Sequence, residues 1–498
     1  MADSVIGVLG AGAMGQGIVQ VALEGGLSVV VHDAKPGAAE AGLEQVFKRL
    51  ARGVEKERLA ADAVEAMRGR VTLVEALDGF AECGIVIEAV FEDLALKQRI
   101  FRELEAVVGD DCILASNTSS LLIAAIARPC RRRQRIAGMH FFNPVPLMRL
   151  VEVVRGPETG EDTVRRLIEL AIDLDRTPVV ARDAPGFIVN HGGRAFTTEA
   201  MRILHEQVAS PAEIDAVMRD CCGFRMGPCE LMDLTGIDVN FPVTQSIFHG
   251  FSDDPRLKTS FPHLALHAAG RLGRKSGLGH YAYDDRGRMR LPPSPDYLTQ
   301  AKPATRLVLA EADANLRAFA GELGAELVIR DDGEAPLLAA PLGEDCTGFA
   351  ARSGHDYRRL VGLDLTCDVS RRVTLMTAPG ADPACRDAVA ALIIRSGRAA
   401  TVIRDSPGFI AQRIRAMIAN LGAEMAQIGI AEPAEIDIAM RLGLNYPSGP
   451  LELAEQLGLA AVLTVLQNLQ AITGDDRYRP SLWLRRRALL GLPIYTPD

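Results

Sequence analysis

The run Ser4-Val-Ile-Gly-Val-Leu-Gly-Ala-Gly-Ala-Met-Gly15, near the start of the sequence, decides the fold. Its first half is apolar and predicts a short buried strand, and the glycines Gly10, Gly12 and Gly15 follow without a gap. Gly10 permits a tight turn, Gly12 lets the backbone approach a pyrophosphate, and Gly15 lets a helix pack closely on the strand. The pattern predicts the phosphate-binding turn of a dinucleotide-binding fold.

The residues after this turn support the same prediction. Ala13 to Gly25 has the apolar spacing of a helix, whose first N–H groups would face the phosphates. Leu27 to Asp33 predicts a second strand that ends in an acid, at the usual distance beyond the glycine turn. A carboxylate at this position binds both ribose hydroxyls and repels a 2′-phosphate. The sequence therefore favours NAD over NADP.

Two further predicted strands end in polar residues. Gly84 to Val90 is followed by Glu92 and a helix that contains Lys97, and Asp111 to Ser116 is followed by Asn117-Thr-Ser119-Ser120. In a doubly wound sheet these strand ends border the ligand crevice, so we expect Asn117 and Ser119 to face the nicotinamide. The alternative is that Ser119 or Ser120 only caps the next helix.

A further predicted strand carries His140, a candidate catalytic base. Arg135 to Phe142 is an apolar run that delivers His140 near its end, with Asn143 and Glu152 further along. A histidine can take a hydroxyl proton near neutral pH, and a carboxylate would fix its tautomer and stabilise the imidazolium. The alternative is a satisfied core histidine beside a proline-rich turn. The nucleotide fold upstream favours the catalytic interpretation.

These residues carry a family resemblance. The chain resembles the 3-hydroxyacyl-CoA dehydrogenases over essentially its full length. The matching segments are Gly10–Gly15, Ile87–Ala89, Glu92–Lys97, Ser116–Ser120, His140–Glu152, Pro185–Asn190 and Gly273–Gly277. Through Gly236–Phe241, Val243, Thr244 and Phe248 it is most similar to the long bacterial members of phenylacetate catabolism, which act on 3-hydroxyadipyl-CoA.

The resemblance implies a role for each matching residue. His140 would be the base and Glu152 its partner. The residues that would position the substrate and the nicotinamide are Ser119, Asn143 and Asn190, and those that would contact cofactor or CoA groups are Glu92, Lys97 and Lys275. One departure is His191, where relatives usually carry arginine, which puts any ion pair at that position in doubt.

Composition limits the other possibilities. The formal net charge of −9 argues against nucleic acid as a partner, and no apolar run reaches the length of a membrane helix. The nine cysteines are scattered without a CxxC pair and predict reduced thiols in a cytoplasmic protein without a metal site. CoA still requires a local basic surface, for which we expect Lys48 and its basic neighbours. The alternative for each of them is a solvated helix face.

The second half of the chain contains a repeat. Asp183-Ala-Pro-Gly-Phe-Ile returns as Asp405-Ser-Pro-Gly-Phe-Ile, and we call the distance from position 183 to position 405 the repeat offset. Glu213-Ile-Asp and Gly227-Pro return at the same offset, which predicts a duplicated helical domain. The repeat offset maps His140 to Gly362, Asn143 to Leu365, Glu152 to Thr374 and Asn190 to Gln412. We therefore expect the second copy to be a non-catalytic scaffold.

The predicted architecture is α/β, with two helical domains. We expect a Rossmann-type doubly wound sheet in residues 1–184, a helical domain in 185–284, a proline-rich linker in 285–305, a degenerate Rossmann-like segment in 306–404 and a second helical domain in 405–498. Single-copy relatives pair two subunits through the helical domain, as the resemblance implies. The two copies here would form an intrachain pseudo-dimer, and the chain could still self-associate.

The expected function is NAD-dependent oxidation of an L-3-hydroxyacyl-CoA to the 3-ketoacyl-CoA, with 3-hydroxyadipyl-CoA as the expected substrate. The alternatives are a 3-hydroxybutyryl-CoA or fatty-acyl β-oxidation dehydrogenase, a β-hydroxyacid dehydrogenase with a lysine base, and a non-catalytic crystallin-like relative. Arg194 lies one helical turn after Asn190, so a terminal carboxylate of the substrate could bind it. The alternative for Arg194 is a structural ion pair.

Overall fold

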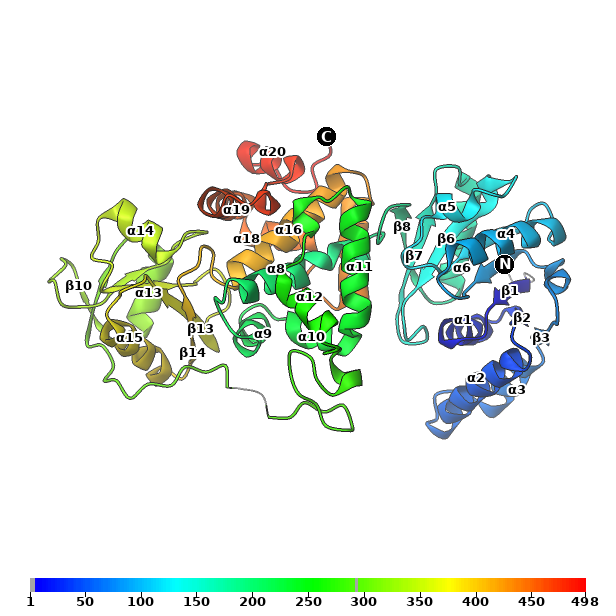
Figure 1. Cartoon of the computed structure of the whole chain (residues 1–498), viewed down its shortest axis with the longest axis horizontal. Coiled ribbons are helices and arrows are strands. Elements are labelled where there is room, and N and C mark those ends of the chain that lie inside the picture. Colours follow the sequence, from blue (N-terminus) through cyan, green and yellow to red (C-terminus); the bar gives the residue numbers. More distant parts are fainter. Residues whose placement is uncertain (1–4, 292–293) are drawn as a thin grey trace. The chain divides into compact units, whose positions relative to one another are not determined.

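The computed structural model describes residues 5–291 and 294–498, so Ser4 of the first expected strand and Pro292 and Pro293 of the expected linker lie outside the described residues. The chain divides into two compact units (Figure 1). Unit 1 comprises residues 1–191 and 428–444, and unit 2 comprises residues 192–427 and 445–498. Within the described part, no helix is both long and apolar enough to cross a membrane.

Unit 1 is built on a sheet of eight strands in the order β3-β2-β1-β4-β5-β6-β7-β8. Neighbouring strands are parallel except β6 and β7, which are antiparallel. The strands are β1 (Val5–Leu9), β2 (Ser28–His32), β3 (Val71–Leu73), β4 (Ile85–Glu88), β5 (Ile113–Ser116), β6 (Ile136–Phe141), β7 (Leu150–Arg155) and β8 (Thr177–Arg182). This arrangement places the predicted glycine turn at the end of a central strand.

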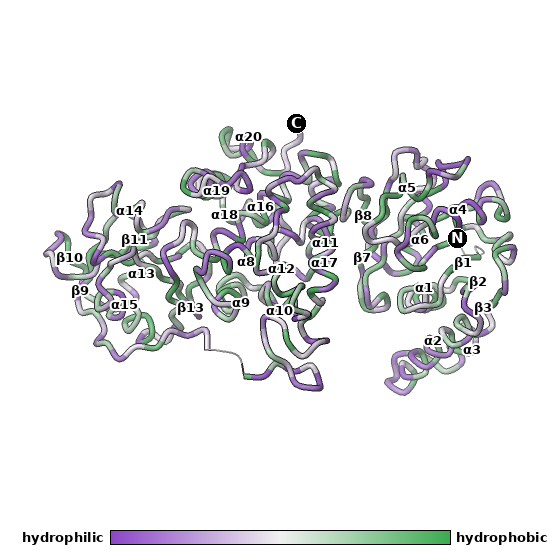
Figure 2. The backbone as a smooth tube through the Cα atoms, in the orientation of Figure 1, coloured by the Kyte–Doolittle hydropathy of each residue, from purple (hydrophilic) through white to green (hydrophobic). Residues whose placement is uncertain are grey.

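Most helices of unit 1 lie between these strands in the sequence, and α7 and α17 come after the last strand. The helices are α1 (Ala13–Glu24), α2 (Ala38–Glu55), α3 (Ala61–Arg68), α4 (Leu94–Val107), α5 (Ile123–Ala127), α6 (Glu161–Asp173), α7 (Val189–Gly192, whose last residue belongs to unit 2) and α17 (Pro433–Leu444). The core joins strand residues such as Val8 and Val29 to Ile18 of α1 and Leu167 of α6. Figure 2 shows the contrast between the apolar strands and the hydrophilic stretches of α2.

Unit 2 contains a second, smaller sheet of six strands in the order β10-β9-β11-β12-β13-β14. The strands are β9 (Arg306–Leu309), β10 (Glu326–Val328), β11 (Leu337–Ala339), β12 (Leu360–Leu363), β13 (Arg372–Thr377) and β14 (Ala399–Arg404), with helices α13 (Ala314–Glu322), α14 (Cys346–Ser353) and α15 (Pro383–Arg395). Its last three strands repeat the pattern of β6, β7 and β8, antiparallel and then parallel. The chain connecting β9 to β10 carries no glycine-rich turn of the kind that follows β1.

The remaining helices of unit 2 form its helical part (Figure 1). The first helical segment supplies α8 (Arg194–His205), α9 (Pro211–Asp220), α10 (Pro228–Thr235), α11 (Ile237–Gly250) and α12 (Phe261–Ala268). The second supplies α16 (Ala411–Gln427), α18 (Pro450–Leu457), α19 (Leu459–Thr473) and α20 (Leu482–Leu490). These elements confirm the expected fold class of a Rossmann-type sheet, a second α/β segment and two sets of helices.

Two hydrogen bonds are related by the repeat offset. In unit 1 the backbone N–H of Arg182 donates to the carbonyl of Ile430 at 2.7 Å, and in unit 2 that of Arg404 donates to Val208 at 3.0 Å. In the first case the end of β8 binds the turn before α17, and in the second the end of β14 binds the turn before α9. The helices beyond these turns also match, since α17 contacts β7 and β8 while α9 contacts β13.

The expected residue mapping between the two halves is wrong in one strand. Leu363 pairs with Leu375 across β12 and β13, and the next residue, Asp364, donates its backbone N–H to the carbonyl of Thr374 at 3.0 Å. In unit 1 the corresponding pair is His140 and Glu152. Asp364, and not Gly362, therefore occupies the strand position of His140, because β12 is shifted along the chain relative to the repeat offset.

Candidate active site

The glycine turn has the geometry that its sequence predicts. Gly10 has a φ of 104°, and a Cβ atom on it would lie 2.6 Å from the carbonyl oxygen of Ala89. A Cβ atom on Gly15 would lie 1.8 Å from the carbonyl oxygen of Gly10, so only glycine lets α1 come this close. Beside Gly12, in contrast, a Cβ atom would meet nothing within 4 Å. The backbone is thus open where a pyrophosphate must approach the start of α1.

Asp33 lies beside this turn. Its Oδ2 accepts the backbone N–H of Ala11 at 2.8 Å, and its Oδ1 accepts that of Lys35 at 2.9 Å. These bonds fix the carboxylate at the end of β2, where an acid binds ribose hydroxyls. The glycine turn and Asp33 together fit the adenosine half of NAD.

A buried ion pair between Lys97 and Glu88 lies at the end of β4. Nζ of Lys97 lies 2.7 Å from Oε1 of Glu88 and 3.2 Å from Oε2 of Glu92, and both Lys97 and Glu88 are almost fully buried. Glu88 also accepts the hydroxyl of Ser116 at 2.7 Å. Glu88 was not among the expected site residues, although it ends an apolar strand and lies in the matching segment Ile87–Ala89. Through Lys97 it ties β4 and β5 to Glu92.

Glu92 holds the polar loop after β5. Its Oε1 accepts the hydroxyl of Thr118 at 2.5 Å and the backbone N–H groups of Ser119 and Ser120 at 3.1 Å each. Burial alone would raise the pKa of Glu92, but the Thr118 hydrogen bond and the charge of Lys97 outweigh it and lower that pKa. Glu92 therefore stays ionised and fixes the loop that carries Ser119.

Asn117 and Asn190 connect this loop to its neighbours. The side-chain oxygen of Asn117 accepts the backbone N–H of Phe141 at 2.8 Å, which links the end of β5 to β6. The side-chain nitrogen of Asn190 lies 3.4 Å from the carbonyl oxygen of Ser119, to which it donates. Ser119 and Asn190 are therefore neighbours in unit 1, although they are far apart in the sequence.

His140 and Glu152 form the central pair. They face each other across β6 and β7, and Nδ1 of His140 lies 2.6 Å from Oε2 of Glu152. The other oxygen of Glu152 accepts the backbone N–H groups of Ile188 and Val189 at 3.0 and 2.9 Å. Glu152 is fully buried, and His140 is 6% exposed. The pair is therefore held rigidly from both sides.

This geometry determines what the imidazole can do. With Nδ1 bonded to a carboxylate, the proton of a neutral His140 resides on Nδ1 and leaves Nε2 as a free lone pair. A substrate hydroxyl can give its proton to Nε2, and Glu152 then stabilises the positive charge that forms. The aromatic rings of Phe142 and Phe187 lie beside the imidazole, with centroids 4.4 and 5.9 Å away. The pair fits a general base for a hydroxyl group.

Four other expected site residues have different surroundings. Lys48 on α2 and Asn143 after β6 are exposed in unit 1. Lys275, in unit 2, lies 2.7 Å from Oδ1 of Asp238, and its hydrogen bond lowers the pKa of that acid. Arg194 on α8 is 7% exposed and donates to the hydroxyl of Thr244 at 2.7 Å. Lys275 and Arg194 thus belong to a different compact unit from His140.

Comparison with family models gives two matches. The model described as 3-hydroxyacyl-CoA dehydrogenase, NAD binding domain, matches residues 5–184. The model described as 3-hydroxyacyl-CoA dehydrogenase, C-terminal domain, matches twice, over residues 186–283 and 408–493. The starts of the two C-terminal matches, at positions 186 and 408, are separated by the same repeat offset as the sequence motifs.

Individual relatives cover different shares of the chain. The 3-hydroxyadipyl-CoA dehydrogenase of Escherichia coli K12 is 38% identical over 492 residues, 97% of each chain. A crystal structure of 3-hydroxybutyryl-CoA dehydrogenase from Escherichia coli K12 superposes with a TM-score of 0.88 at 36% identity, covering 98% of both chains. A probable 3-hydroxybutyryl-CoA dehydrogenase of Deinococcus radiodurans is 41% identical over 277 residues, which are 56% of this chain and 99% of that protein.

Proposed function

The chain belongs to the 3-hydroxyacyl-CoA dehydrogenase family, and on that premise we propose that its substrate is 3-hydroxyadipyl-CoA and that His140 is the general base. Family membership confirms the expected reaction, the NAD-dependent oxidation of a 3-hydroxyacyl-CoA. The observation that carries the assignment of the base is the 2.6 Å contact between His140 and Glu152.

Several residues of unit 1 have separate roles in the proposed oxidation. Nε2 of His140 takes the proton of the 3-hydroxyl group, and Glu152 balances the charge of the resulting imidazolium. Bound NAD supplies the acceptor for the hydride that leaves C3. Ser119 and Asn190, which adjoin each other, would orient the substrate and the nicotinamide. The glycine turn and Asp33 would hold the adenosine half of the cofactor.

The proposed substrate follows from the full-length relative and from Arg194. The relative that covers 97% of this chain is named a 3-hydroxyadipyl-CoA dehydrogenase. Arg194 follows Asn190 by four residues in the sequence, and its guanidinium can form paired hydrogen bonds with a carboxylate. Burial lowers the pKa of Arg194 to about 10, so the side chain keeps its charge at neutral pH. We place the enzyme in phenylacetate catabolism for the same reasons.

Initial rates of NADH formation across a set of 3-hydroxyacyl-CoA substrates test this proposal. The set contains the butyryl, hexanoyl and adipyl thioesters at the same NAD concentration. The proposal predicts the highest kcat/KM for the adipyl substrate. A higher value for the hexanoyl or butyryl substrate would leave the reaction unchanged and refute the dicarboxylic specificity.

We further propose that the two helical segments are copies of one domain and pair with each other as the two subunits of a dimer do. The reciprocal bonds Arg182–Ile430 and Arg404–Val208 support this, because a two-fold interface repeats each contact with the partners exchanged. A chain that ends at Asp284 would lose its internal partner. It should dimerise or aggregate through the exposed surface, whereas a soluble, active monomer in light scattering would refute the pairing.

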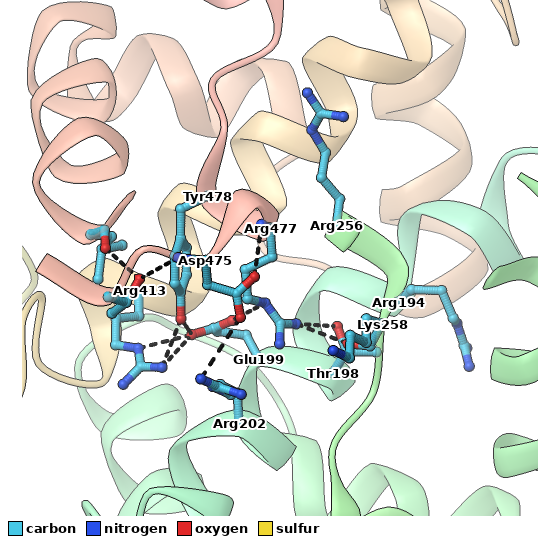
Figure 3. A network of polar contacts seen from close by, with 12 residues as sticks. Arg194, Thr198, Glu199, Arg202, Arg256, Lys258, Arg413, Asp475, Arg477 and Tyr478 are labelled. Atoms are coloured by element: carbon cyan, nitrogen blue, oxygen red, sulfur yellow. Dashed lines mark hydrogen bonds and ion pairs between the residues drawn. The ribbon is translucent and has the colours of Figure 1, made fainter. Parts of the chain in front are cut away.

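A buried ionic network contributes to this pairing (Figure 3). The carboxylate of Glu199 on α8 forms ion pairs with Arg413 of α16 at 2.8 Å and with Arg477 at 3.3 Å. It also accepts a hydrogen bond from the hydroxyl of Tyr478 at 2.8 Å. In the same view the side chain of Arg194 points away from Glu199. The one acid thus links the first helical segment to two arginines of the second.

A further inference from the structure

Unit 2 contains a cavity of about 300 Å³ between its second sheet and its helices α16, α18 and α19. Thr366 and Gln412 contribute polar groups to its wall, and Asn315 and Gln456 also border it. Every described residue that lines it is uncharged. Its apolar walls are made by Leu342, Leu365, Ala416, Leu457, Val462 and Val465.

The cavity occupies the place in the second half that the substrate residues occupy in the first. The repeat offset carries Asn190 to Gln412 and Arg194 to Ala416, and both counterparts line the cavity. A similar hydrogen bond is found in both halves. Asn190 donates to the carbonyl of Ser119 in the loop after β5, and Gln412 donates at 3.2 Å to the carbonyl of Pro341 in the corresponding loop after β11.

The groups that perform the chemistry are replaced there. Asp364 and Thr374 stand where His140 and Glu152 stand in unit 1. Asp364 is fully buried, and its Oδ1 already accepts the Thr366 hydroxyl at 2.7 Å and Gln412 at 3.1 Å. Neither a histidine base nor a glycine-rich phosphate turn accompanies this cavity in the described part of the second sheet. This cavity therefore lies beside groups other than the histidine and glutamate of unit 1.

We propose that this cavity binds the uncharged aliphatic chain of an acyl thioester without converting it. The inference rests on the proposed duplication of the catalytic half. The apolar walls suit a hydrocarbon chain, and a volume of about 300 Å³ lies at the lower end of the range for ligand sites, which favours a short chain. Ala416 replaces Arg194, so a terminal carboxylate would find no positive charge among the lining residues.

Photolabelling of the full chain tests this site directly. The probe is a hexanoyl thioester of N-acetylcysteamine that carries a diazirine on its acyl chain, and the labelled peptides are identified by mass spectrometry. Labelling should appear on α16 or α19 in addition to any labelling of the catalytic half. The readout does not require turnover, so failure of the proposed dehydrogenase substrate would not affect it.

Two variants on one helix make the test specific. Ala461→Phe places a ring into the cavity, because Ala461 lines it, whereas Thr464→Phe places the same ring on the exposed face of α19. Ala461→Phe should reduce the labelling of α16 and α19 by roughly tenfold or more, since overpacking a site excludes its ligand. Thr464→Phe should leave it unchanged, and both variants should keep the wild-type kcat. Labelling confined to the first half, or equal labelling of α19 in the two variants, would overturn the proposal.

Discussion

Nδ1 of His140 lies 2.6 Å from Oε2 of Glu152, and the two residues face each other across an antiparallel pair of strands. His140→Gln should therefore lower kcat by roughly 10²–10⁴-fold, the usual contribution of a general base, while NADH still binds. Glu152→Gln should lower kcat less, because it keeps the base and removes only its charged partner. Stopped-flow kinetics and NADH fluorescence measure the two effects. More than about a tenth of wild-type kcat in His140→Gln would place the base elsewhere.

Arg194→Leu should change substrate preference. A hydrogen bond to a charged group contributes about 1.5–3 kcal/mol, so the ratio of kcat/KM for 3-hydroxyadipyl-CoA over 3-hydroxyhexanoyl-CoA should fall by roughly ten- to a hundredfold. Thr244→Val is the matched control, since it removes the 2.7 Å contact of Arg194 and keeps the guanidinium. Equal losses on both substrates in Arg194→Leu would mean that the arginine only stabilises the helices.

Glu199→Gln should destabilise unit 2 strongly. Although burial alone would raise the pKa of Glu199, Arg413 and Arg477 lower it, so the acid is ionised. Its removal takes the carboxylate partner from buried Arg477 and leaves buried Arg413 paired with Glu206 alone, a loss of about 3–5 kcal/mol. The control is Arg202→Gln, at a partly exposed ion pair with Glu206, which should cost about 1 kcal/mol or less. Calorimetry measures the unfolding temperatures of the Glu199→Gln and Arg202→Gln variants. Equal values would contradict the central role of Glu199.

Asp364→Asn should stabilise the protein in a pH-dependent way. Burial raises the pKa of Asp364 from its usual 3.8 to about 7. Between these values the folded protein holds a proton that the unfolded chain has lost, so the free energy of unfolding decreases as the pH rises from about 4 to about 7. The variant lacks this decrease and should be more stable than wild type at pH 8, but not at pH 4.

The measurement for Asp364 is the unfolding temperature of each protein across this pH range. Asp215, whose pKa burial also raises to about 7, adds a decrease of the same sign that both proteins share. The difference between variant and wild type therefore isolates Asp364. A difference that does not change with pH would show that Asp364 has an ordinary pKa in the folded protein.

Local signals in the sequence predicted the nucleotide-binding half well. The glycine turn, helix α1 and Asp33 are set by short-range rules of steric space and helix ends, and each has the expected geometry. Glu88 was missed because its role comes from Lys97 and Ser116, which reach it from other elements. Only the tertiary fold brings these three side chains together.

The repeat offset identified only some of the corresponding residues in the two halves, for a similar reason. It relates the bonds of Arg182 and Arg404 to each other, because the strand ends and turns that they join have the same spacing in both halves. It failed for His140, which it mapped to Gly362 in place of Asp364, because strand pairing and not chain distance decides which residues face each other. A shift by an even number of positions keeps the same strand face inward, so the apolar pattern of β12 carries no trace of it.

The ion pair between Glu199 and Arg413 bears on how such a chain evolves. The repeat offset relates Glu199 to Leu421 and Arg413 to His191, so the reverse pair of positions holds a leucine and a histidine. In an assembly of two identical subunits every substitution occurs twice, and one side of the interface cannot keep a charge pair that the other has lost. On the proposed duplication, two copies joined in one gene are free of that constraint, because each copy can be substituted without the other.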